Sequence, residues 1–235
     1  MRRKSIWFAL GLVFVLVAVT ALVVGLLLKH EPDFYRALDI PPGPERQQKS
    51  AEFQNQFFNW MNSIKNRERD WWMVVTADEL NSYFQEDFVR SAGGDANLPE
   101  GCHDLRVVIE PQRLRLACRY GSGFWSTIVT LDLKLWLVAH EMNTVAVQIL
   151  ALEAGALPAS PQMLLDNITE AARNAGMEVT WYRHEGHPVA ILRYQPNQTR
   201  PTLLLQRLEL QPGRIVIAGG SPDPMSARAP ASTEP

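Results

Sequence analysis

The first feature of the chain is an unbroken apolar run near its start. Ile6–Leu28 spans 23 residues without a charge, and Thr20 is its only polar side chain. A helix of this length reaches roughly 34 Å, enough to cross a hydrocarbon core of about 30 Å. The run therefore predicts a transmembrane helix over residues 6–28, through which the chain contacts the lipid bilayer.

Charge on the two sides of this run predicts its orientation. Arg2, Arg3 and Lys4 precede it, whereas the residues after it carry mixed charge. By the positive-inside rule, residues 1–5 form a cytoplasmic stub, and the rest of the chain lies outside the cytoplasm at the cell membrane. A cleaved signal peptide ending at 19–21 is the alternative, but seven further apolar residues follow that site.

A proline-rich segment and an amphipathic helix come next. Residues 29–44 hold three prolines within four positions, which predicts a non-helical spacer. From residue 45 to about 67, apolar residues recur at helical spacing. This stripe consists of Phe53, Phe57, Trp60 and Ile64. It is typical of a helix packed on its own domain; a helix lying on the bilayer surface is the alternative.

A short strand and a capped helix follow. Residues 71–75 are β-prone, and Thr76 with Glu79 three positions later forms a capping-box pattern. We therefore expect a helix that starts after Thr76 and ends near Ser91.

From residue 105 the apolar period changes to two, which is typical of β-strands. A hairpin is predicted over 105–120, and a long strand over 125–139 turns into another at 144–152. One face of the long strand is apolar throughout. That face carries Val129, Leu131, Leu133, Leu135 and Leu137.

The last third of the chain predicts one long helix and four strands. Ser160-Pro161 and Gly176 bound a helix over 160–175, with Leu164 and Ile168 on its buried side. The strands are expected at 177–184, 189–194, 202–210 and 214–218. About eight antiparallel strands with an inserted helix give an α+β domain over 45–220, and the Pro-, Ala- and Ser-rich residues 221–235 predict a disordered tail.

Composition narrows the function classes. Three of the 23 basic residues precede the apolar run and all 25 acidic ones follow it, so the exported part carries a net charge of −5. Nucleic-acid binders are usually basic, so we expect no nucleic-acid partner. Cys102 and Cys118 are the only cysteines. Export permits a disulfide between them, and two free thiols are the alternative.

Candidate chemistry is sparse. His140-Glu141 begins like the zinc motif H-E-x-x-H but lacks the second histidine. His184 and His187 flank a glycine turn, as at a solvated hairpin end; a weak surface metal site is the alternative. We therefore expect no enzyme, no metal and no cofactor, and an anchored hydrolase is the third alternative for the function.

Two short motifs carry a family resemblance. Thr76-Ala-Asp-Glu-Leu-Asn81 leads from a strand into a helix, and Gly155-Ala-Leu-Pro158 precedes the second helix. In these motifs and in its order of elements the chain resembles the YpmS-like and LmeA-like single-pass envelope proteins. The resemblance implies a strongly curved sheet wrapped on the long helix, as in tubular lipid-binding domains, and a lipid-handling role.

These observations lead to an expected function. We expect a membrane-anchored, non-enzymatic domain that binds or passes a lipid in a groove between the sheet and the 160–175 helix. The expected groove residues are Leu131, Leu133, Leu135, Leu137, Leu164 and Ile168. Arg106, Arg115 and Arg119 lie on the polar side of the first hairpin; they either solvate the sheet or contact lipid headgroups or an envelope polymer. The alternative function is an accessory subunit that binds an envelope protein and has no ligand cavity.

Overall fold

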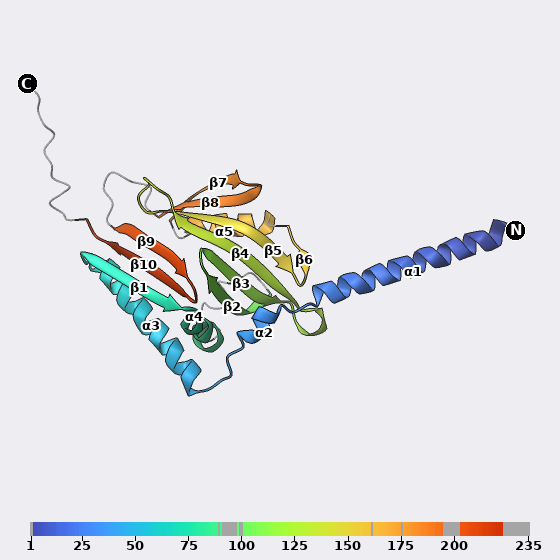
Figure 1. Cartoon of the computed structure of the whole chain (residues 1–235), viewed down its shortest axis with the longest axis horizontal. Coiled ribbons are helices and arrows are strands. Elements are labelled where there is room, and N and C mark those ends of the chain that lie inside the picture. Colours follow the sequence, from blue (N-terminus) through green and yellow to red (C-terminus); the bar gives the residue numbers. More distant parts are fainter. Residues whose placement is uncertain are drawn as a thin grey trace, which may run out of the picture.

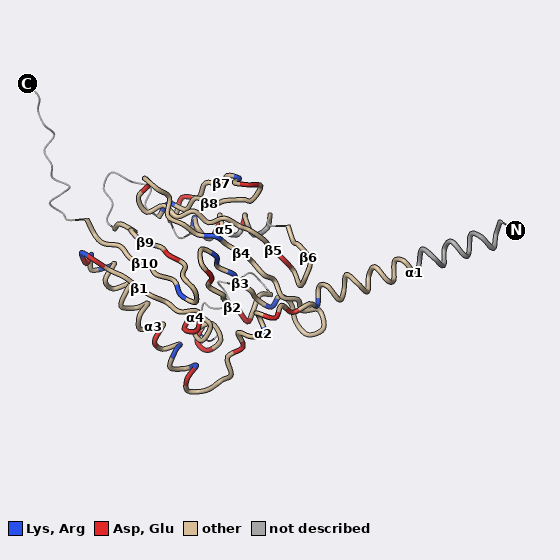
Figure 2. Tube along the Cα trace, viewed as in Figure 1, with Lys and Arg blue, Asp and Glu red and all other residues tan. Residues whose placement is uncertain are grey.

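The computed structural model describes residues 2–88, 90, 98, 101–160, 162–174, 176–194 and 203–222. Its first helix, α1 (Arg2–Leu28), projects away from the rest of the fold (Figure 1). The described residues contain one helix that is long and apolar enough to cross a membrane, and none of its residues 15–28 is buried. Along the part of α1 that Figure 2 does not draw in grey there is no charged residue. The predicted apolar helix is therefore present, while its orientation stays a prediction.

Ten strands, counted within the described ranges, form two antiparallel sheets. The smaller sheet has the order β1-β10-β9, with β1 at Asp70–Thr76, β9 at Leu204–Gln211 and β10 at Arg214–Gly220. Helix α3 (Pro44–Lys65) packs against its edge strand β1. Trp71, Met73 and Val75 of β1 are buried.

The larger sheet has seven strands in the order β2-β3-β4-β5-β8-β7, and β6 pairs with β5. The strands are β2 (Cys102–Glu110), β3 (Arg113–Tyr120), β4 (Thr127–Leu137), β5 (Thr144–Ala154), β6 (Leu157–Pro158), β7 (Glu178–His184) and β8 (His187–Arg193). The α+β class is confirmed. The prediction of one sheet of about eight strands is wrong, because β1 pairs with β10 and these two form a separate sheet with β9.

The capping box is confirmed at the start of α4 (Ala77–Tyr83), which continues into the π-helical turn η1 (Phe84–Phe88). The Glu79 amide donates to the Thr76 hydroxyl at 3.2 Å, and the Thr76 amide donates to the Glu79 carboxylate at 2.7 Å. Fully buried Asn81 then joins α4 to β2. Its side-chain amide donates to the Val107 carbonyl and accepts from the Val107 N–H, both at 2.8 Å.

The apolar face of the large sheet contacts helices at both ends. Strand register sets Leu114 opposite Leu133 and Leu116 opposite Leu131, so these side chains share a face. Near β2 this face packs against α4, η1 and the small sheet. The cluster contains Ala77, Leu80, Phe84, Val107, Ile109, Leu114, Leu116, Leu135, Leu210 and Ile215. At the other end lies α5 (Gln162–Asn174), where the Trp181 indole of β7 donates to the Thr169 hydroxyl at 2.9 Å.

The predicted spacer is part of the fold. Its residues form a short helix, α2 (Asp33–Ala37), which precedes the three prolines at the end of the spacer. Tyr35 is fully buried against Ala117 and Ile128, so packing begins before residue 45. Of the predicted disordered tail, residues 223–235 lie outside the described part of the chain.

Candidate functional site

The domain binds the end of α1 through a turn of the large sheet. Between β5 and β6, the Ala156 N–H donates to the Leu27 carbonyl at 2.8 Å. The Thr127 hydroxyl, at the start of β4, donates to the Leu28 carbonyl. A helix leaves its last carbonyls without partners inside the helix, and here the domain supplies donors for two of them. The end of α1 is thereby held against the sheet.

This contact requires a glycine at position 155. Gly155 has a φ of +62°, and a Cβ atom there would lie 2.2 Å from the Leu27 carbonyl oxygen. Side chains of other residues cannot approach a backbone oxygen so closely. The sequence motif read as the entry to the second helix is thus also the docking point of α1.

A cleft opens directly beside this docking turn. Its volume is about 480 Å³, within the range of pockets that hold small ligands. It lies between the C-terminal half of β5, the turn between β7 and β8, and the start of α5. The lining comprises Ile149–Glu153, Pro158–Ser160, Gln162, Leu165, Arg183 and Gly186–Pro188. Since β8 pairs with β5 only over residues 144–148, the rest of this β5 edge is left for the cleft and for β6.

The cleft combines apolar and charged side chains. Leu165 is half-buried and presents apolar surface, whereas Ile149 is buried and presents almost none. Arg183 and Glu153 are exposed, and His187 is half-buried. A lining that is about equally polar and apolar suits an amphiphilic ligand better than a purely polar one.

The predicted groove leucines of β4 do not line this cleft. Leu133 is buried and faces Leu114 and Ile149 in the sheet. Leu135 belongs to the core cluster near β2 and borders a second cavity, of about 380 Å³, between β4 and β9.

The remaining predicted groove residues are placed as follows. Leu131 and Leu137 are half-buried, opposite residues of β5. Ile168 is half-buried on α5, and the side chain of Leu164 lies outside the described part of the structure. The residue of α5 that lines the cleft is Leu165.

Arg106, a predicted headgroup contact, is buried and held by the spacer. Its guanidinium donates to the Tyr35 carbonyl and, at 3.0 Å, to the Asp39 carboxylate. It also stacks 4.1 Å from the centroid of the Tyr35 ring. The Tyr35 hydroxyl donates to the Asp104 carbonyl at 2.7 Å, and burial raises the pKa of this phenol.

The other two predicted headgroup arginines also have partners within the chain. Arg115 donates to the Asp132 carboxylate at 2.7 Å and lies 4.9 Å from the Phe34 ring centroid. Arg119 lies 3.4 Å from the Glu31 carboxylate. The arginine face of the hairpin therefore fixes the segment that follows α1 to the sheet, and a headgroup role for these residues stays a prediction.

The two cysteines lie side by side on β2 and β3. Their sulfur atoms are 3.0 Å apart, and the Cys118 thiol donates to Cys102. This hydrogen bond lowers the pKa of Cys102 to about 7, whereas the same contact and burial raise the pKa of Cys118. Both are thiols in this structure, and their sulfur atoms are in contact.

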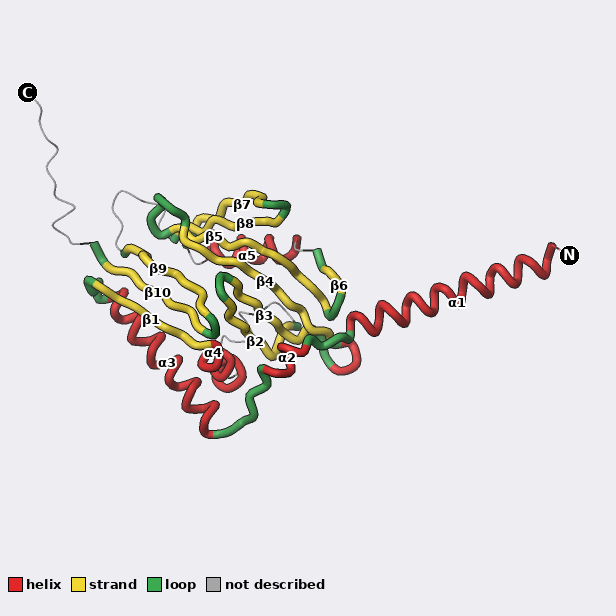
Figure 3. The backbone as a smooth tube through the Cα atoms, viewed as in Figure 1, coloured by secondary structure: helices red, strands yellow, loops and turns green. Residues whose placement is uncertain are grey.

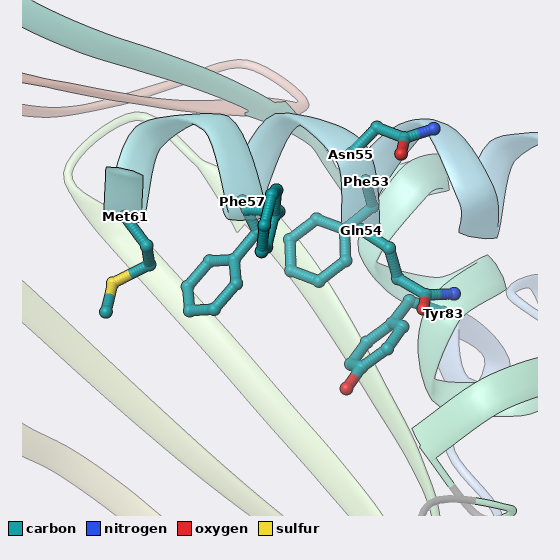
Figure 4. Close-up of a pocket in the computed structure, with 7 residues that line it drawn as sticks. Phe53, Gln54, Asn55, Phe57, Met61 and Tyr83 are labelled. Atoms are coloured by element: carbon teal, nitrogen blue, oxygen red, sulfur yellow. The ribbon is translucent and has the colours of Figure 1, made fainter. Parts of the chain in front are cut away.

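Helix α3 packs on its own domain and leaves an aromatic groove exposed (Figure 4). Phe53 lies 4.7 Å from Tyr83 of α4 between ring centroids, which confirms packing on the domain. The groove, of about 420 Å³, includes exposed Phe57, Phe58 and Met61. The helical stripe predicted Phe53 and Phe57 but not Phe58 or Met61, which lie off that stripe.

Neither a group of metal ligands among the described residues nor a comparison with known proteins points to a further site. No group of three or more His, Cys, Asp or Glu side chains suited to a metal ion occurs among the described residues. No family model, curated protein or solved structure matches this chain. The resemblance to YpmS-like and LmeA-like proteins stays a prediction.

Proposed function

We propose that this chain is a single-pass membrane protein whose extracytoplasmic domain binds or passes a lipid at the membrane surface. One observation carries the proposal: the cleft beside α5 is built on the same β5–β6 segment that binds the end of α1. Leu152 and Glu153 line the cleft on one side of Gly155, and Pro158 lines it on the other. A ligand leaving the bilayer therefore meets this cleft within a few residues of the apolar helix.

The apolar part of the cleft surface offers contact to an acyl chain. Burial of each methylene contributes about 0.8 kcal/mol, so a chain segment in the cleft offsets part of its loss of contact with the bilayer. Arg183 and His187 lie at the cleft and can contact an anionic headgroup. In this proposal they replace Arg106, Arg115 and Arg119, whose guanidinium groups are used within the fold. The proposal involves no reaction, and an anchored hydrolase stays the third alternative.

Native mass spectrometry of the full chain released from lipid nanodiscs tests this function. Lipid bound around α1 is expected in every variant, so the comparison is between variants. We expect Leu165→Glu to lose a retained lipid, because the carboxylate enters the cleft. Met142→Glu is the matched control, since Met142 is exposed in the turn at the opposite end of β5. Equal lipid retention by the wild type and both folded variants would refute the proposal.

The second candidate is an accessory subunit of an envelope complex. The exposed groove on α3 favours it, because Phe57, Phe58 and Met61 are 44%, 65% and 46% exposed. Clustered exposed aromatic residues are typical of protein-binding surfaces. If this candidate is correct, Phe58→Glu abolishes cross-linking to an envelope partner in cells, and lipid retention does not differ between Leu165→Glu and the wild type.

A further inference from the structure

The turn between β3 and β4 exposes two aromatic rings. It contains the short helical turn η3 (Gly123–Trp125), held by a hydrogen bond of 3.0 Å from the Ser126 hydroxyl to the Gly123 carbonyl. Phe124 is 71% exposed and Trp125 is 84% exposed. Their rings meet edge to face, with centroids 5.4 Å apart. Neighbouring rings this exposed are unusual on a soluble surface and indicate a binding surface.

The turn is fixed beside the domain end of α1. The Lys29 ammonium donates to the Phe124 carbonyl and lies 3.4 Å from the centroid of the Phe124 ring. Thr127, two residues after Trp125, donates to the Leu28 carbonyl. Figure 3 shows η3 as a short red turn next to the domain end of α1. The rings therefore lie at the level where the apolar run ends.

We propose that Phe124 and Trp125 insert into the headgroup region of the bilayer as a second membrane contact. The inference rests on the proposed crossing of the membrane by α1. Tryptophan rings concentrate at membrane interfaces, the apolar Phe124 ring adds buried area there, and a lysine beside them extends its ammonium group toward water while its stem stays apolar. The continuity of the turn with α1 identifies the bilayer as the occupant of this surface.

The second contact has a consequence for the cleft. A domain held by α1 alone can tilt relative to the bilayer, whereas a domain that also inserts two rings keeps one side against the membrane. The rings lie on the β3–β4 turn, and the docking turn joins β5 to β6. Together they keep the membrane-proximal end of β5, and so the cleft, at the bilayer surface.

Depth-dependent fluorescence quenching tests the inference on the full chain. The protein is reconstituted into phosphatidylcholine–phosphatidylglycerol vesicles containing lipids brominated near the headgroup end of the acyl chain. The emission of Trp125 is obtained as the difference between the spectra of the wild type and Trp125→Phe. We expect this difference to be blue-shifted and to be quenched by the brominated lipid. Trp72→Phe is the matched control, because Trp72 is 72% exposed on β1, across the fold from α1. This variant should lose only emission that aqueous iodide quenches.

Two outcomes would overturn the inference, and they can be told apart. If alkaline extraction strips the protein from the vesicles, α1 does not cross the membrane, and the proposed function fails with the inference. If the protein stays in the membrane but Trp125 is quenched by iodide as strongly as Trp72, only the inference fails. Lipid retention in the cleft is measured separately, with Leu165→Glu.

Discussion

Gly155→Ala should release the domain from the end of α1. The added Cβ would lie 2.2 Å from the Leu27 carbonyl oxygen and 2.5 Å from that of Leu28, whereas such contacts are essentially never shorter than 3.0 Å. The helix end must therefore retreat by nearly an ångström. The Ala156 hydrogen bond to Leu27, now 2.8 Å, then exceeds normal hydrogen-bond length.

The expected magnitude follows from that bond and from backbone strain. Loss of the hydrogen bond costs about 1 kcal/mol, which raises the population of the undocked state about fivefold. The left-handed backbone adds about 1–2 kcal/mol of strain for a residue with a Cβ. Gly213→Ala is the matched control, because Gly213 has a φ of +72° and a methyl group added there would meet no described atom within 4 Å. It carries the strain without the clash.

Tryptic cleavage after Lys29 provides the assay. When opening is faster than cleavage, the rate of cleavage tracks the population of the open state. In nanodiscs we expect the fragment beginning at His30 to form about fivefold faster, or more, in Gly155→Ala than in the wild type. Gly213→Ala should not change the rate. Equal rates in all three proteins would show that the domain is not docked on α1.

Two further predictions concern the fold and the compartment. Asn81→Ala leaves the N–H and carbonyl of Val107 without partners, so urea unfolding should show that the free energy of unfolding falls by about 2–5 kcal/mol. The control, Asn59→Ala at an exposed position, should change it by less than about 0.5 kcal/mol. A loss below about 1 kcal/mol for Asn81→Ala would contradict the reasoning. In an oxidising compartment, thiol oxidants should take two electrons and two protons from Cys102 and Cys118 to form a disulfide. Alkylation without reductant should then modify neither cysteine. Two alkylated thiols in protein isolated from cells would contradict export to such a compartment.

Local signals in the sequence predicted most individual elements. The Thr76–Glu79 capping box predicted the start of α4 because both partners lie within one helical turn. The alternating pattern predicted β2 and β3, and the caps at Ser160 and Gly176 predicted α5 within two residues. These features depend on neighbours in the chain, which a sequence shows directly.

Features that depend on distant partners were not predictable. The hairpin arginines have the spacing of a solvated face, and only the folded chain shows that Arg106 is covered by Tyr35, 71 residues earlier. Likewise, the apolar face of β4 predicted a groove, but part of it is filled by residues such as Leu210 from the small sheet. The cleft lies instead at the edge of β5, beyond residue 148, where pairing with β8 stops. The sequence carries no local signal for how far two strands pair.

The central claim is that a lipid leaves the bilayer into the cleft beside α5. Photo-cross-linking in membranes that contain a lipid with a diazirine in its acyl chain tests it most directly, because the modified peptides locate the bound chain. The account predicts label on peptides covering residues 149–165 in the wild type and its loss in Leu165→Glu. Label confined to α1, or label on residues 53–61 of α3 in place of the cleft, would contradict it.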